Sequence, residues 1–116
     1  MPQETIISVP ATSNSKPILR AVDAAAKALR LSVTLRAELK SFPGSTHWHL
    51  KQGRQPGTLE ITWWPKERKL WIKVQAGRTA AWIDELAPRL KRKIESHLRF
   101  PRRLEKSTKK RNVVSD

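Results

Sequence analysis

Two stretches in which apolar and polar residues alternate run from Gly57 to Gln75, on either side of a break at Pro65–Arg68. Side chains on a strand point to alternate faces, so this pattern predicts a hairpin with one buried face. Pairing across the break places Ile61 opposite Ile72, and a one-residue slip would set every apolar residue against a polar one. The apolar members are Leu59, Ile61, Trp63, Leu70, Ile72 and Val74.

Two earlier segments alternate in the same way and extend the predicted sheet. Residues 31–40 also fit a continued helix, but Ser32, Val33 and Thr34 are poor helix formers, which favours a strand. A turn over residues 41–44 would pair Lys40 with Ser45, Leu35 with Leu50, and Ala37 with Trp48. We therefore expect a four-stranded antiparallel meander with strands at about 32–40, 45–51, 58–64 and 69–75.

Amphipathic helices are expected before and after these strands. Apolar residues recur at helical spacing from Pro17 to Leu29 and again from Ile83 to Leu98, with a kink or break predicted at Pro88. Both helices need a surface to cover, so we place them on one face of the sheet. The predicted fold is α+β, in the order α-β-β-β-β-α, over residues 17–101. A disordered leader (1–16) precedes it, and a basic disordered tail (102–116) follows.

Composition indicates a polyanionic partner. The 116 residues carry 24 Lys and Arg against 10 Asp and Glu, a formal net charge of +14 and a pI of about 11.2. Such an excess favours nucleic acid, with an anionic membrane surface or no polyanion as alternatives. The absence of cysteine excludes disulfides, thiolate zinc sites and cysteine nucleophiles. No apolar run approaches the roughly 18 residues of a membrane span, and no signal peptide is evident, so a cytoplasmic location is expected.

The face of the sheet opposite the helices is predicted to be open to water and to carry an indole pair, Trp64 and Trp71. Bases stack on exposed indoles with about 1–3 kcal/mol each, and nearby lysines would hold phosphates. Alternatively, the leader or tail covers these rings, or two chains dimerise through them. The rows expected on this face are Arg36, His49, Glu60 and Lys73, then Glu38, His47, Thr62 and Trp71, with Lys51, Trp64 and Lys69 toward the edges.

The sequence therefore predicts a non-enzymatic nucleic-acid-binding protein without cofactors. RNA or a single strand is expected rather than duplex DNA, because no element is typical of a helix that reads the major groove. The last helix and the tail would add salt-sensitive affinity for phosphates. The expected binding residues are Lys51, Trp64, Lys69, Trp71, Lys73, Arg89, Lys91, Arg92, Lys93, Arg102 and Arg103.

His47 and His49 alternate on one predicted strand and therefore share a face. With Glu60 or Glu38 they have the chemistry of a metal site, but Arg36 and Lys73 in the same row would repel a cation, so no metal is expected. General acid–base cleavage of RNA by either histidine is the enzymatic alternative.

Gly44–His49 resembles the Gly-Ser-x-His strand of HicA-type mRNA-interferase toxins, although Thr46 is inserted before His47 and no other part of the chain matches. This resemblance implies RNA cleavage and a three-stranded fold. The helix–sheet–helix order is also similar to that of double-stranded-RNA-binding domains. Residues 79–85 lack the basic start of the last helix of those domains.

Overall fold

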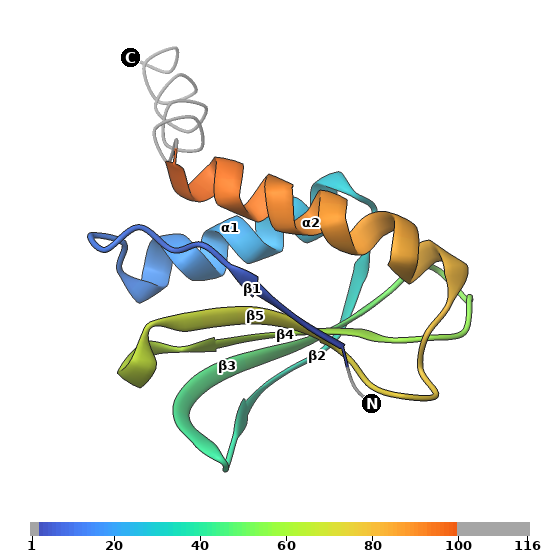
Figure 1. Cartoon of the computed structure of the whole chain (residues 1–116), viewed down its shortest axis with the longest axis horizontal. Helices are drawn as coiled ribbons and strands as arrows, with labels where there is room; N and C mark the ends of the chain where they lie inside the picture. The colour runs from blue at the N-terminus through green and yellow to red at the C-terminus, as the bar shows by residue number, and fades with distance from the viewer. Residues whose placement is uncertain (1–2, 100–116) are drawn as a thin grey trace, which may run out of the picture.

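The computed structural model describes residues 3–99, in which one antiparallel sheet carries two helices on a single face (Figure 1). The predicted α+β class is confirmed. Among these residues no helix combines the length and the hydrophobicity of a membrane span. In chain order the elements are β1 (Gln3–Ile7), α1 (Ser15–Ala28), β2 (Ser32–Leu39), β3 (Phe42–Lys51), β4 (Leu59–Trp64), the 3-10 turn η1 (Pro65–Glu67), β5 (Lys69–Val74) and α2 (Ala81–Arg99).

The sheet has five strands in the order β1-β5-β4-β3-β2, so the predicted count of four is wrong. The additional strand is β1, which pairs antiparallel with β5 from Gln3 opposite Val74 to Ile7 opposite Leu70. Gln3, Glu4 and Thr5 are polar, and Ile6 and Ile7 are both apolar although only Ile7 is buried. The sequence of β1 therefore lacks the apolar–polar alternation that identifies a half-buried strand. The expectation of a disordered leader is therefore wrong for residues 3–7, which the edge of β5 orders.

The three strands from β3 to β5 pair as predicted. Ile61 on β4 lies opposite Trp48 on β3 and Ile72 on β5, and the β4–β5 hairpin closes with Trp64 opposite Lys69. Apolar side chains therefore line one face continuously across the three strands. This row forms the floor of the hydrophobic core.

The register between β2 and β3 differs from the prediction. Val33 lies opposite Leu50, and a β-bulge then shifts the pairing so that Leu35 lies opposite His49 and Arg36 opposite Trp48. One extra residue in a strand reverses the face that the following side chains occupy. The expected pairs of Leu35 with Leu50 and of Ala37 with Trp48 are therefore wrong. Arg36 moves to the helix-covered side, away from the row in which it was placed.

Asp23 on α1 contacts both Arg36 and Trp48, the residues paired after the bulge. One carboxylate oxygen accepts a hydrogen bond from Trp48 Nε1 at 3.1 Å, and the other contacts Arg36 Nη1 at 3.3 Å. A guanidinium beyond the bulge is thus paired with a carboxylate instead of facing the histidines. The bulge thus turns Arg36 toward α1, where Asp23 lies within reach.

β3 begins at Phe42, opposite Leu39, and not at Ser45 as expected. The turn is reduced to Lys40 and Ser41, so most of residues 41–44 extend the strand. The irregular region beyond the turn is held by side chains. The carboxylate of Glu38 accepts the Gly44 N–H at 2.7 Å, and Ser45 Oγ accepts the Leu39 N–H at 3.1 Å.

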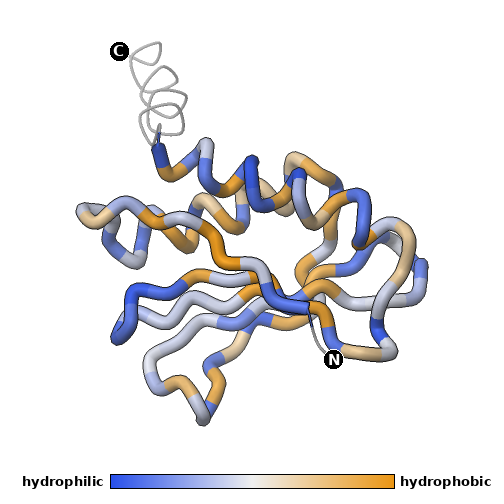
Figure 2. The backbone as a smooth tube through the Cα atoms, viewed as in Figure 1, coloured by the Kyte–Doolittle hydropathy of each residue, from blue (hydrophilic) through white to orange (hydrophobic). Residues whose placement is uncertain are grey.

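Both helices bury their apolar stripes against the sheet, as predicted, and apolar and polar turns alternate along them in Figure 2. α2 is continuous through Pro88, which lies on its exposed side, so the predicted alternative of a break with restart is wrong. The Nε1 atoms of Trp63 and Trp82 donate to Ser15 Oγ and to the Pro56 carbonyl. The buried helical side chains are Ile18, Ala21, Val22, Ala25 and Ala26 on α1, and Trp82, Ile83, Leu86, Leu90, Ile94 and Leu98 on α2.

Candidate functional site

Polar side chains from three adjacent strands gather on the face of the sheet away from the helices. The register places His47 beside Thr62 and His49 beside Glu60 on neighbouring strands. β5 continues these rows with Trp71 opposite Thr62 and with Lys73 opposite Glu60. The predicted rows are thus present for β3, β4 and β5. They lose their β2 members, Arg36 to the bulge and Glu38 to its bond with Gly44.

His47 lies at the centre of this cluster and uses both ring nitrogens within it. Nδ1 lies 2.7 Å from Thr62 Oγ1, and Nε2 lies 3.3 Å from Glu60 Oε1 and 3.1 Å from His49 Nε2. His47, Glu60 and Thr62 are 4%, 6% and 2% exposed, whereas His49 is half-buried. The cluster therefore opens to solvent on the His49 side.

The His47 ring is neutral at pH 7. Burial lowers the pKa of His47, and the Glu60 carboxylate opposes this shift without cancelling it. A neutral imidazole has one N–H and one lone pair, so one ring nitrogen donates and the other accepts. Both nitrogens of this ring contact partners in the chain, whereas His49 is only half-buried and is therefore the more accessible of the two histidines.

The indole pair was predicted to be exposed, but neither ring is. Trp71 is 4% exposed, and Trp64 is half-buried with its Nε1 donating to the Pro43 carbonyl at 3.1 Å. Phe42 makes edge-to-face contacts with Trp64 at 4.9 Å and with Trp71 at 5.3 Å between ring centroids. Lys69 Nζ lies 4.6 Å from the Trp71 ring. The expectation of an exposed Trp71 is wrong because the long β2–β3 hairpin carries Phe42 over the rings.

The lysines expected to hold phosphates beside the indoles are partly engaged within the chain. Lys69 covers Trp71, and Lys73 lies in register between Glu4 on β1 and Glu60 on β4. Lys51, at the end of β3, is half-buried. These residues line the helix-free face without forming one exposed basic patch.

Exposed basic side chains are more numerous on the helix layer. α1 and α2 pack side by side (Figure 1), and their exposed sides are rich in Lys and Arg. Asp84 and Glu85 occupy the first turns of α2, where acids complement the helix dipole. Asp23 and Glu95 are occupied by Arg36 and Lys91. The basic helix face consists of Lys16, Arg20, Lys27, Arg30, Arg89, Arg92, Lys93 and Arg99.

Of the basic residues predicted on the last helix, Arg89, Arg92 and Lys93 belong to the basic helix face. Lys91 is half-buried and paired with Glu95 at 2.9 Å, so its charge is used within the chain. Arg102 and Arg103 lie outside the described residues. The helical spacing of the buried residues could have shown from the sequence that Lys91 lies on a different side of the helix from Arg89, Arg92 and Lys93. It could also have shown that α1 presents basic residues on its exposed side.

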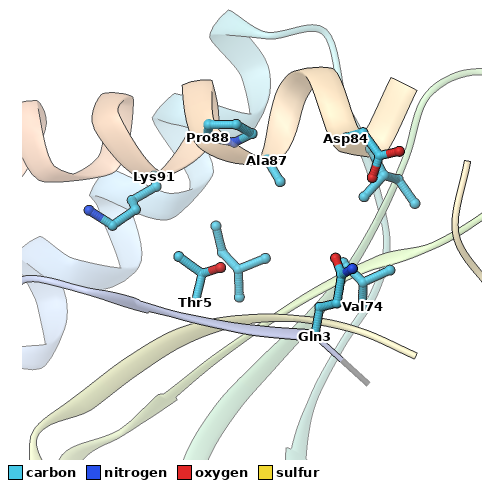
Figure 3. Close-up of a pocket in the computed structure, with 9 residues that line it drawn as sticks. Gln3, Thr5, Val74, Asp84, Ala87, Pro88 and Lys91 are labelled. Carbon is cyan, nitrogen blue, oxygen red and sulfur yellow. The ribbon is translucent and has the colours of Figure 1, made fainter. Parts of the chain in front are cut away.

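A pocket of about 270 Å³ lies between α2 and the β1–β5 edge of the sheet (Figure 3). Its labelled polar side chains lie apart, with Lys91 at one end and Asp84 at the other. Ligand pockets usually occupy about 300–1,000 Å³ and bring several polar groups together. We therefore do not assign the function to this pocket.

No protein-family model matches the chain, and comparisons with curated proteins and with solved structures find no match. The resemblance of Gly44–His49 to HicA-type toxins is therefore confined to the residues that suggested it. The functional argument rests on the two surfaces described above.

Proposed function

We propose that this protein binds nucleic acid through the basic helix face. The observation that carries the proposal is the grouping of eight exposed basic side chains, seven on two adjacent helices and Arg30 just after α1. The nearby acids are paired or confined to the start of α2. Clustered Lys and Arg release counterions from a phosphate backbone, which supplies sequence-independent affinity.

The proposed mode is contact with phosphates and not stacking on bases. A base could reach Trp71 only by displacing Phe42 and Lys69, so the stacking argument for single strands loses its support. Phosphates are common to RNA and DNA, and we therefore propose backbone binding with little preference between them. A strong preference for single strands would bring base stacking back, with the half-buried Trp64 as the first residue to test.

The test compares two triple variants of equal charge. Arg89→Gln, Arg92→Gln and Lys93→Gln remove three positive charges from the basic helix face. Lys40→Gln, Arg54→Gln and Lys66→Gln remove three from exposed positions in the strand connections. Binding is measured by fluorescence anisotropy with labelled single- and double-stranded oligonucleotides over a range of salt concentrations.

The helix triple variant is expected to reduce the slope of log K against log[salt] by about 2, since each lost phosphate contact contributes about 0.7–0.9. The control triple variant should change the slope by less than half as much. Equal losses in the two variants would show that net charge alone attracts the nucleic acid. Absence of binding by the unmodified protein at low salt would refute the proposed function.

A further inference from the structure

His47, His49 and Glu60 form a compact cluster of nitrogen and oxygen atoms on the helix-free face of the sheet. Each of the three residues offers one atom able to bind a metal, a ring nitrogen or a carboxylate oxygen, and these three atoms all lie within 4.8 Å of one another. They come from adjacent strands in fixed register, since His49 lies opposite Glu60 and His47 lies two residues away on β3. We propose that these three residues bind a zinc ion.

The distances agree with a tetrahedral site. Zinc bonds of about 2.0–2.2 Å to imidazole nitrogen and carboxylate oxygen place neighbouring ligand atoms about 3.3–3.5 Å apart. His47 Nε2 lies 3.1 Å from His49 Nε2 and 3.3 Å from Glu60 Oε1. These two distances are within a few tenths of an ångström of the tetrahedral value. The third pair, His49 and Glu60, lies within 4.8 Å, and the ion would draw these two side chains together.

A second interaction orients the central ligand. Thr62 Oγ1 lies 2.7 Å from His47 Nδ1 and is itself buried. When Nδ1–H donates to this hydroxyl, Nε2 carries the lone pair and points at the shared centre. Metal-binding histidines almost always use their other nitrogen in this way, and the partner fixes the tautomer and the ring orientation. Thr62 is thus a positioning residue for the proposed zinc site.

The local charge is more favourable for a cation than the sequence indicated. Arg36, expected beside His49, lies on the opposite side of the sheet in contact with Asp23. Lys73, opposite Glu60, and Lys51, two residues beyond His49 on β3, remain as positive charges on this face. Two imidazoles and one carboxylate favour zinc over magnesium or calcium, which prefer oxygen ligands.

Three protein ligands leave one zinc position for water or another ligand. Catalytic zinc sites have this arrangement, whereas structural sites use four protein ligands. The half-buried His49 lies on the solvent side of the cluster, so the fourth position faces outward. This inference is independent of nucleic-acid binding, because the basic helix face lies on the other side of the sheet.

The experiment adds Zn²⁺ alone to metal-free protein without a histidine tag. Isothermal titration should give one ion per chain, and saturating zinc should raise Tm by at least about 5 °C. Co²⁺ in place of zinc should give the intense visible absorption of a tetrahedral ion. Failure of the unmodified protein to bind zinc would overturn the proposal.

Variants locate the ion. His49→Ala should abolish binding, and it is chosen because His49 is the least buried ligand. Thr62→Val keeps the side-chain shape and should weaken zinc binding about 10–100-fold. His97→Ala, which removes the remaining histidine of the chain from α2, should bind zinc as the unmodified protein does. Unchanged zinc binding by folded His49→Ala would refute the assignment.

Discussion

Glu95 on α2 connects the edge strand to the helix layer, and Glu95→Ala is expected to lower the free energy of unfolding by about 2 kcal/mol. One carboxylate oxygen accepts the Ser8 N–H at 2.8 Å and Lys91 Nζ at 2.9 Å, and the side chain is 12% exposed. A hydrogen bond to a charged group contributes about 1.5–3 kcal/mol, and an i,i+4 ion pair about 0.3–0.5 kcal/mol. Ser8 is exposed, so its N–H regains water in the variant, which favours the lower half of this range.

The contribution of Glu95 should also depend on pH. Burial alone would raise the pKa of Glu95, but the bonds from the Ser8 N–H and Lys91 outweigh burial, and the pKa lies below its ordinary value of 4.5. A carboxyl group whose pKa is lower in the folded state stabilises the fold above its unfolded pKa. That stability is lost as the pH falls through the folded-state pKa. The stability difference between the unmodified protein and Glu95→Gln should therefore be full at pH 7 and shrink below about pH 4.5.

Urea unfolding followed by tryptophan fluorescence measures the loss of stability, and hydrogen exchange locates it. Exchange of the β1 amides should accelerate more than exchange in β4, because the broken contact lies next to the edge strand. Glu67→Ala, which removes the same charge from an exposed position in η1, is the control and should change stability by less than about 0.5 kcal/mol. Equal losses in the two variants, or a loss that does not vary with pH, would refute the reasoning.

Two further predictions test the packing. Trp71→Ala should lower the free energy of unfolding by about 3–5 kcal/mol, as for other buried aromatic rings. Phe42→Ala should lower it by about 1–2 kcal/mol, because two edge-to-face contacts are lost, and should increase acrylamide quenching of tryptophan fluorescence. Unchanged quenching would show that Phe42 does not cover the indoles. Gly57→Ala places a Cβ 3.0 Å from the Arg78 carbonyl oxygen at a φ of +99° and should cost at least about 2 kcal/mol in urea unfolding, more than Gly53→Ala, whose Cβ meets nothing within 4 Å. Equal costs for the two glycine variants would contradict the crowding at Gly57.

Much of the sheet and helix pattern could be predicted because it depends on local periodicity. Strict alternation favours the pairing of Ile61 with Ile72, since a one-residue slip would set apolar side chains against polar ones. The stripe from Ile83 to Leu98 likewise selects the buried side of α2. The same periodicity brings His47 and His49 to one face with Glu60, so the members of the proposed zinc site were visible in the sequence.

The remaining features depend on contacts between distant segments. β1 has the sequence Gln-Glu-Thr-Ile-Ile, which shows no apolar–polar alternation, and its pairing with β5 makes it a strand. The bulge in β2 turns Arg36 toward Asp23 on α1, and the extension of β3 brings Phe42 over Trp71.

The sequence by itself determined which side chains alternate and where positive charge concentrates. Only the tertiary structure decided which of these side chains share a surface, because the bulge after Val33 reverses the faces of Leu35 and Arg36. That reversal separates Arg36 from the histidines, while the register between β3 and β4 brings His47, His49 and Glu60 together.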